Sequence, residues 1–101
     1  MPRTVGIGSL NAAVEGIVAP LAAEIAPIRV NAVSPGYVDT PWWDAVPADQ
    51  RAAIFEQAAA GLPVRHIATV DDIAQAIVLL ATNRNITGEV LQTDGGAHLN
   101  A

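Results

Sequence analysis

Apolar residues recur every three or four positions through the first quarter of the chain, which predicts a helix with one apolar stripe. The recurring set is Ile7, Leu10, Val14, Ile17, Val18, Leu21 and Ile25. Pro20 lies inside this stretch, and we expect it to bend the helix because proline lacks the amide hydrogen and crowds the preceding turn. Pro27 is expected to end the helix, since the residue before a proline is pushed out of the α region.

Two short apolar runs have the character of strands. Residues 28–33, IRVNAV, are rich in β-branched side chains and stop at Ser34-Pro35-Gly36, a pattern typical of a buried strand and a turn. Residues 37–46 contain Pro41 and a pair of tryptophans and are predicted to form a loop. Residues 89–93 are predicted to form a second strand, which the turn residues Asp94-Gly95-Gly96 close.

Two further helices are predicted between these strands. The first covers residues 48–60, with Pro47 at its first turn and Gly61 as the left-handed glycine that follows its end. The second begins at Thr69, because Thr69-Val70-Asp71-Asp72 resembles a capping box. Its apolar face consists of Ile73, Ala76, Ile77 and Leu80.

The order helix, strand, helix, helix, strand predicts an α/β fold. Two strands joined through helices are expected to be parallel, with a right-handed crossover. A two-stranded parallel sheet has two unpaired edges, and buried parallel sheets need helices on both faces. We therefore expect the outer part of a larger doubly wound sheet, forming one partial domain over residues 1–101 that is completed by further chain or by another copy.

Composition removes several classes of function. The 101 residues carry a net charge of −5, and all five basic residues are arginines scattered along the chain, so no basic face is available for nucleic acid or an anionic membrane. No apolar stretch approaches membrane-spanning length, and cysteine is absent. His66 and His98 lack metal-ligand spacing, so no metal site is expected. These features predict a cytoplasmic protein without nucleic-acid or membrane partners.

Three segments carry a resemblance to a known family. Residues 11–36, NAAVEGIVAPLAAEIAPIRVNAVSPG, are similar to the interface helix, sixth strand and following turn of the short-chain dehydrogenases/reductases. Residues 63–74, PVRHIATVDDIA, resemble the link into the last helix of that family, and residues 87–96, TGEVLQTDGG, resemble its final strand and turn. The matches follow one another in order and cover nearly the whole chain.

The resemblance implies the C-terminal portion of a Rossmann-like doubly wound sheet and an NAD- or NADP-dependent oxidoreductase. In the family, a preceding N-terminal half supplies the glycine-rich turn that receives the pyrophosphate, and we expect that half to be absent from this chain. Gly6-x-Gly8-x-x-Asn11 echoes the motif but follows no strand and lacks its third glycine, so we interpret it as the start of a helix.

The family performs its chemistry with a tyrosine and a lysine four residues later. In this chain the matching positions are Ile7 and Asn11. Asn11 could still hydrogen-bond a ribose hydroxyl, but Ile7 has no proton to give. The chain contains no lysine, and its single tyrosine, Tyr37, is expected to be a loop or pocket-wall residue and not a relocated acid. We therefore expect no catalytic residue in this chain.

One wall of the cofactor site is expected to remain. The resemblance places Pro35 and Gly36 beside the nicotinamide, the backbone of Val38 at its carboxamide, and the Thr40 hydroxyl at the same group. The alternative is that Pro35-Gly36 only turns the chain and that Thr40 belongs to a loop. Without the other half of the site, we expect cofactor binding by this chain alone to be weak.

Paired tryptophans follow this wall, and their role stays open at this point. Trp42 and Trp43 fall where relatives cap the substrate pocket, so they could line an apolar substrate site or pack against a helix or partner chain.

Two functions follow from these features. The first is a truncated or fragmentary short-chain dehydrogenase/reductase that does not turn over substrate alone. The alternative is a non-catalytic assembly module, because the long helix and final strand form subunit interfaces in the family. Its partner would be a second copy or the complementary N-terminal half.

Overall fold

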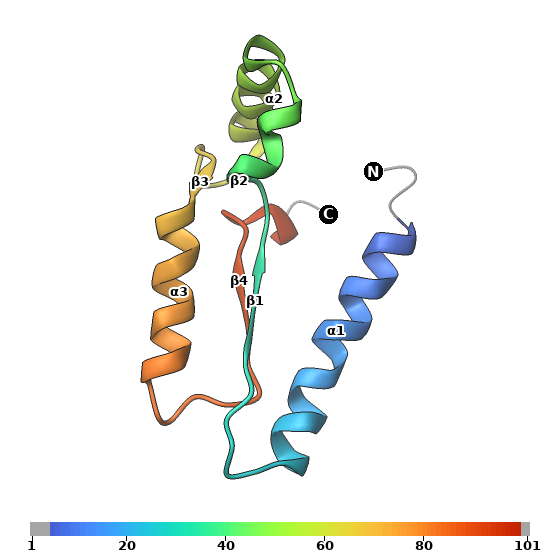
Figure 1. Cartoon of the computed structure of the whole chain (residues 1–101), viewed down its shortest axis with the longest axis vertical. Helices are drawn as coiled ribbons and strands as arrows, with labels where there is room; N and C mark the ends of the chain where they lie inside the picture. Colours follow the sequence, from blue (N-terminus) through green and yellow to red (C-terminus); the bar gives the residue numbers. More distant parts are fainter. Residues whose placement is uncertain (1–4, 100–101) are drawn as a thin grey trace.

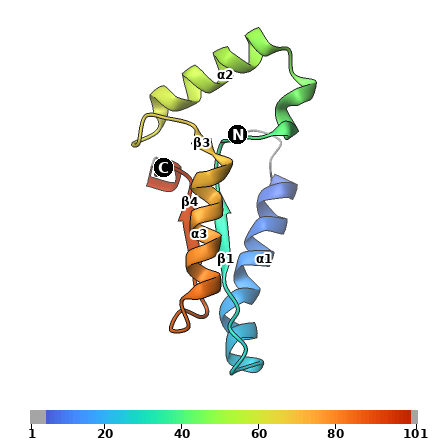
Figure 2. The ribbon, with the colours of Figure 1, turned by 60° about the vertical axis from the view of Figure 1, so that its left-hand side comes forward.

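The computed structural model describes residues 5–99, with side chains from Ser9 onward, and arranges them in three layers (Figure 1). Two parallel strands, β1 (Ala32–Pro35) and β4 (Val90–Thr93), lie between helix α1 (Val5–Glu24) and helix α3 (Val70–Thr82). Ala32 pairs with Val90, and Pro35 pairs with Thr93. Figure 2 shows the same layers from another side. The predicted α/β fold with parallel strands is confirmed.

A second group of elements lies beyond the carboxyl ends of β1 and β4 (Figure 1). A short strand, β2 (Val38–Asp39), pairs in parallel with β3 (Ala68–Thr69). Between β2 and β3 the chain forms a 3-10 helix at Pro41–Ala45 and helix α2 (Ala48–Gly61). After β4, a last 3-10 turn covers Ala97–Leu99. The loop predicted over residues 37–46 was therefore wrong in part, because the β2–β3 pairing and the 3-10 helix give this segment regular structure.

The predicted limits of the first strand were wrong. β1 begins at Ala32 and continues through Pro35, because β4 pairs with these four residues and not with residues 28–31. The preceding residues are held partly by side-chain bonds: the Val30 amide donates to Thr87 Oγ1 at 3.1 Å, and Asn31 Oδ1 accepts from the Glu89 amide at 3.0 Å. The Val30 carbonyl also accepts from the Gly88 amide at 2.8 Å.

Gly61 does not end α2 in the predicted way. It is the last helical residue, and the next residue, Leu62, has an extended backbone with φ −88° and donates its amide to Ala59 at 3.1 Å. The extended Leu62 stops the helix, so no left-handed glycine is needed there. The first helix, α1, contains Pro20 and ends at Glu24, before Pro27 as predicted.

The predicted start of α3 is confirmed in detail. Thr69 Oγ1 accepts from the Asp72 amide at 3.2 Å, and the Asp72 carboxylate accepts from the Thr69 amide at 2.9 Å. This reciprocal pair satisfies two amides that the first turn of a helix would otherwise leave open. Two hydrogen bonds with Thr69 hold the pKa of Asp72 below its ordinary value. The bond with the Thr69 backbone has the larger effect and the bond with its side chain the smaller.

The other end of α3 is tied to the segment before β1. The Arg29 guanidinium donates to the carbonyls of Leu80 at 2.6 Å, Ala81 at 2.8 Å and Ile86 at 3.0 Å. The last carbonyls of a helix lack partners within the helix, and a cation is favourable at that negative end. Arg29 therefore fixes α3 against the strand layer.

Little of the described chain is buried. The buried hydrophobic residues are Val18, Ala22, Leu62 and Leu80. The radius of gyration is 15.5 Å, against about 13 Å for a compact chain of this length. The accessible surface is 7267 Å², where a folded monomer of this mass exposes about 5,400 Å². The fold therefore holds apolar surface that its own elements do not cover.

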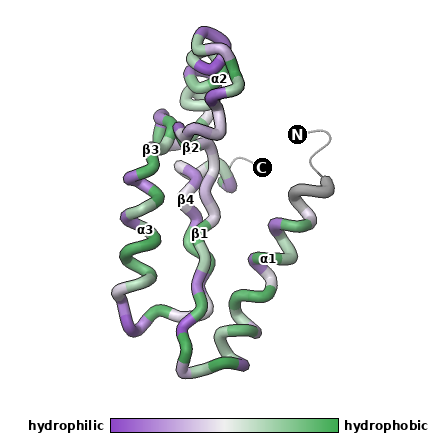
Figure 3. Tube along the Cα trace, viewed as in Figure 1, coloured by the Kyte–Doolittle hydropathy of each residue, from purple (hydrophilic) through white to green (hydrophobic). Residues whose placement is uncertain are grey.

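This surface lies on both outer layers, as the apolar colouring of α1 and α3 shows (Figure 3). Leu10, Val14 and Ile17 of α1 are more than half exposed. On α3, Ile77 is 51% exposed although it belongs to the predicted apolar face, whereas Leu80 is buried. No helix within residues 5–99 is both long and apolar enough to span a bilayer.

Candidate functional site

An open cavity lies at the carboxyl ends of the parallel strands. Its volume is about 690 Å³, within the range of about 300–1,000 Å³ usual for small-molecule sites. The lining residues are Gly36, Tyr37, Val38, Thr40, Trp42, Trp43 and Ala97. Open α/β sheets bind ligands at this edge, because the loops that follow the strands converge there.

Gly36 brings the ends of β1 and β4 together. A Cβ at this position would lie 3.1 Å from the Cβ of Asp94 and 3.2 Å from its Cα, closer than side chains normally pack. The neighbouring turn therefore favours glycine here, because any Cβ would force Asp94 to shift, whether or not a ligand also approaches the backbone.

The turn after β4 is fixed by Asp94. Its carboxylate accepts hydrogen bonds from the Gly96 amide at 3.1 Å, the His98 amide at 3.0 Å and the His98 ring Nδ1 at 3.0 Å. Burial acts to raise the pKa of Asp94, but the bonds from His98 and Gly96 outweigh it and leave the pKa below its ordinary value. The ionised carboxylate thus holds the 3-10 turn whose Ala97 lines the cavity.

Thr40 begins the 3-10 helix at the opposite wall. Its Oγ1 accepts from the Trp42 amide at 3.3 Å, and its carbonyl accepts from the Trp43 amide at 3.1 Å. A threonine hydroxyl can accept and donate at the same time. Within the described part of the chain, no hydrogen bond is donated by this hydroxyl, so its proton is available to a ligand.

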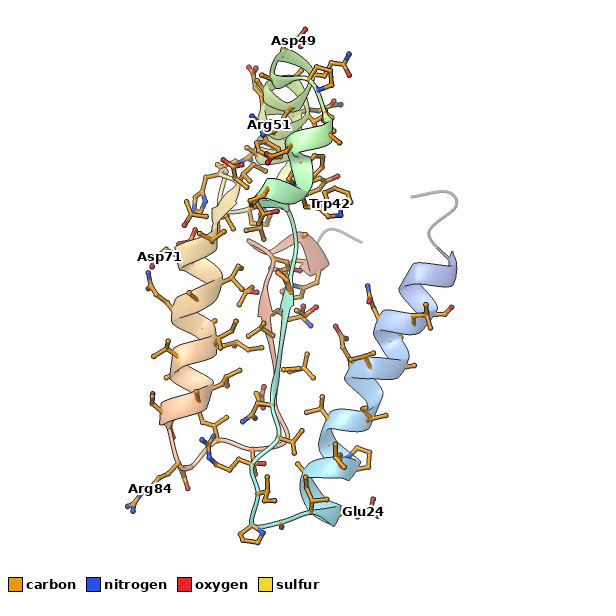
Figure 4. All side chains as sticks on the ribbon, viewed as in Figure 1. Glu24, Trp42, Asp49, Arg51, Asp71 and Arg84 are labelled. Atoms are coloured by element: carbon orange, nitrogen blue, oxygen red, sulfur yellow. The ribbon has the colours of Figure 1, made fainter. Side chains whose placement is uncertain are left out.

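Trp43 is the centre of an aromatic cluster beside Thr40. Its ring stacks on Tyr37 at a centroid distance of 6.0 Å and meets Phe55 of α2 edge-to-face at 5.2 Å. Its indole nitrogen donates to the Val38 carbonyl at 3.1 Å. Trp42 meets Trp43 nearly perpendicularly at 4.9 Å and is 78% exposed. Figure 4 shows Trp42 projecting outward from the 3-10 segment.

The structure brings most of the predicted wall together. Gly36, Val38 and Thr40 line the same cavity, whereas Pro35 ends β1 without being among its lining residues. Asn11 is exposed on α1; the side chain of Ile7 lies outside the described residues. Cofactor binding by these residues stays a prediction.

For the tryptophans, the structure shows packing against a helix for Trp43, and a substrate role stays a prediction. Trp42 and Trp43 line the cavity, and Trp43 also packs against Phe55 of α2. Sequence reasoning missed the Asp94–His98 pair, although its spacing of four residues was a usable signal.

A smaller cavity of about 250 Å³ adjoins this site and shares Tyr37 with it. His66, Asp72 and Asp94 are among its lining residues. Across residues 5–99, however, no three histidine or carboxylate side chains are placed to hold a metal ion. The Asp72 and Asp94 carboxylates instead serve the helix cap and the turn described above.

The layered parallel sheet, with a cavity at its carboxyl edge, is the arrangement of a nucleotide-binding α/β protein. The family described as enoyl-(acyl carrier protein) reductase matches residues 1–98. The chain is 37% identical over 83 residues to a short-chain dehydrogenase/reductase of Malbranchea aurantiaca, covering 82% of this chain and 31% of that protein. The chain therefore belongs to the short-chain dehydrogenase/reductase family.

Two further comparisons agree. The 3-oxoacyl-(acyl-carrier-protein) reductase of Thermotoga maritima is 33% identical over 99 residues, which cover 94% of this chain and 39% of that protein. The crystal structure of a small-chain dehydrogenase in complex with NADPH superposes with a TM-score of 0.91 at 39% identity, over 98% of this chain and 45% of that one. The chain thus spans between about a quarter and two fifths of the length of the curated relatives it matches.

Proposed function

We propose that this chain forms the nicotinamide-side and substrate-side wall of an NAD(P)-dependent oxidoreductase site. The observation that carries the proposal is the single cavity that Gly36, Val38 and Thr40 share at the carboxyl edge of the sheet. A similar protein was solved in complex with NADPH, and the similarity includes this whole region.

The residues fit the nicotinamide end of such a cofactor. The Thr40 hydroxyl has a proton to donate to a carboxamide oxygen, and the cavity wall around Val38 and Gly36 is uncharged. None of the arginines in the described residues lines this cavity, so a pyrophosphate group would depend on chain outside them. When bound, the nicotinamide supplies or accepts a hydride; this chain orients the ring and excludes water from one side.

The chain is not expected to complete the reaction by itself. Proton transfer to a substrate oxygen needs a group with a suitable pKa within hydrogen-bond reach. The matching positions on α1 hold Ile7 and Asn11, and neither side chain exchanges a proton at neutral pH. This proposal assigns binding and orientation to the chain and leaves the proton transfer to residues that it lacks.

Titration with NADH and NADPH, followed by nicotinamide fluorescence, tests the binding part. We expect a saturable change at millimolar concentration, which Thr40→Val weakens severalfold because it removes the hydroxyl and keeps the shape. Thr82→Val is the matched control, because the Thr82 hydroxyl donates to the Val78 carbonyl of its own helix and Thr82 does not line the cavity. No saturable change, or equal effects of both variants, would contradict the proposal. Steady NADPH consumption with a carbonyl substrate would contradict the assigned lack of turnover.

An assembly module is the second candidate function. The exposed apolar row Leu10, Val14 and Ile17 on α1 supports it. So does the accessible surface of 7267 Å². It exceeds that of a folded monomer by about 1,900 Å², whereas one partner in a standard protein interface buries only about 800 Å². Light scattering tests it: an assembly module is at least dimeric at micromolar concentration, and a folded monomer would defeat this role.

A further inference from the structure

The outer half of the cavity has a wall of aromatic rings, and this wall points to a class of ligand. Trp42 leaves 78% of its surface exposed at the cavity, although indole is among the side chains most favourable to bury. The Trp42 ring meets Trp43 nearly perpendicularly at a centroid distance of 4.9 Å, and most of the rest of the ring is exposed. An exposed ring held in place is a platform for another ring.

Several contacts hold Trp43 and the backbone of Trp42 in place. Trp43 is fixed on three sides by Tyr37, Phe55 and the bond from its indole nitrogen to the Val38 carbonyl. The Trp42 backbone is fixed by its amide bond to Thr40 Oγ1. Because Trp43 and the Trp42 backbone are already ordered, a ligand that stacks here causes little further loss of conformational entropy in them, which favours affinity.

The chemistry of the wall selects among ligands. Trp42, Trp43 and Ala97 offer apolar surface and no charge, so a carboxylate gains little there. The polar side chains of the wall are Tyr37 and Thr40, and the Thr40 hydroxyl, which accepts from the Trp42 amide, lies at the end assigned above to the nicotinamide. A flat ring on Trp42 would present its carbonyl or hydroxyl toward that end.

We propose that Trp42 and Trp43 bind an aromatic ring of the substrate, so that the substrate class is an aryl ketone or the corresponding alcohol. This inference rests on the proposed function, since it names the substrate side of the same cavity. Trp42 is the specificity-determining residue, and Trp43 positions it.

The two indole N–H groups make a direct test, because Trp42 and Trp43 are the only tryptophans of the chain. Their signals in a 15N–1H correlation spectrum are followed while 1-tetralone or 1-decalone is added to the full chain. The two ketones share a bicyclic ten-carbon frame, but only tetralone has an aromatic ring. We expect tetralone to shift the Trp42 signal saturably and to bind about threefold to tenfold more tightly than decalone, the usual range for one aromatic contact.

Substitutions separate stacking from general hydrophobic contact. Trp42→Leu should remove this preference, and Trp42→Phe should retain most of it because a ring remains. With Trp42 replaced, the Trp43 indole signal reports binding and folding. Val14→Ala, an exposed apolar position on α1, is the matched control and should leave tetralone binding unchanged.

Each outcome bears on the proposal. The proposal is overturned if the two ketones bind with equal affinity, or if Trp42→Leu keeps the preference for tetralone. It is also overturned if the tryptophan signals shift with protein concentration in the absence of ligand, because a second copy would then cover the rings. The ketones are added without cofactor, so the result is independent of NADPH binding. A tetralone response without any NADPH response would refute the cofactor wall and keep the aromatic site.

Discussion

Replacement of Arg29 by alanine is expected to destabilise the chain more than any other single loss of a surface charge. The guanidinium serves three carbonyls, at 2.6, 2.8 and 3.0 Å, and ties the end of α3 to the segment that leads into β1. A hydrogen bond with a charged partner contributes about 1.5–3 kcal/mol. The bond to Ala81 is exposed and the other two are only partly buried, so water replaces much of the loss. We expect a net cost of about 2–4 kcal/mol.

That cost is large even against the total stability of about 5–15 kcal/mol that is usual for a complete native domain. Urea unfolding followed by far-ultraviolet circular dichroism measures it, with the slope of the transition checked for constancy. Arg29→Lys should recover about half, because the ammonium keeps the charge at the helix end but cannot reach three carbonyls with one planar group.

Arg84→Ala is the matched control. Arg84 is exposed, has no hydrogen bond or ion pair among the described residues, and points away from the rest of the molecule in Figure 4. Surface substitutions usually change stability by no more than about 0.5 kcal/mol. If Arg29→Ala and Arg84→Ala differ by less than that, Arg29 does not tie α3 to the strand layer.

Three further changes test the site and its supports. The pKa of Asp94 is lowered in the folded state, so its contribution to the free energy of unfolding is complete above about pH 4, the ordinary aspartate value, and is lost as the pH falls through the folded value. Asp94→Asn should therefore reduce the loss of stability at acid pH, measured by urea unfolding at several pH values. An unchanged loss in this variant would refute the role of Asp94. Thr69→Ala should cost about 1 kcal/mol by removing the cap of α3, with Thr69→Ser close to wild type; equal stability of the two variants in urea would exclude the cap. Gly36→Ala should cost about 1–3 kcal/mol in thermal unfolding, because its Cβ would meet Asp94 at 3.1 Å; wild-type stability would mean that the turn yields freely.

The elements that local chemistry specifies were predictable. The cap of α3 follows from the side chains of Thr69 and Asp72, which bond to each other's backbone within four residues. The parallel pairing of β1 with β4 follows from the helices between them, since a parallel partner requires a crossover. The family was recognisable because its segments keep their order and spacing.

The features that sequence reasoning missed depend on contacts between distant segments. β1 covers Ala32–Pro35 because β4 lies opposite, and no local propensity encodes that register. The strand β2 exists because Ala68 lies beside it, about thirty positions away in the chain. The clustering of Phe55 with Trp43 likewise requires α2 to fold back over the 3-10 helix.

For the candidate site, the residues could be named from the sequence, but the contacts that each of them makes in the fold could not. Gly36 was expected to allow a ligand to approach, whereas its nearest constraint is Asp94 of the neighbouring turn. Trp42 and Trp43 could be assigned to a cavity or to packing only when their surroundings were known: one is 78% exposed, and the other contacts Phe55.

The central claim, that the chain contributes one wall of a nicotinamide site, is tested most directly by mapping NADPH onto the backbone amides by nuclear magnetic resonance. The account predicts saturable shifts at Gly36, Val38 and Thr40, and none at Ile77 and Leu80, which line a different cavity on α3. Shifts spread evenly over the chain, or confined to α3, would contradict it.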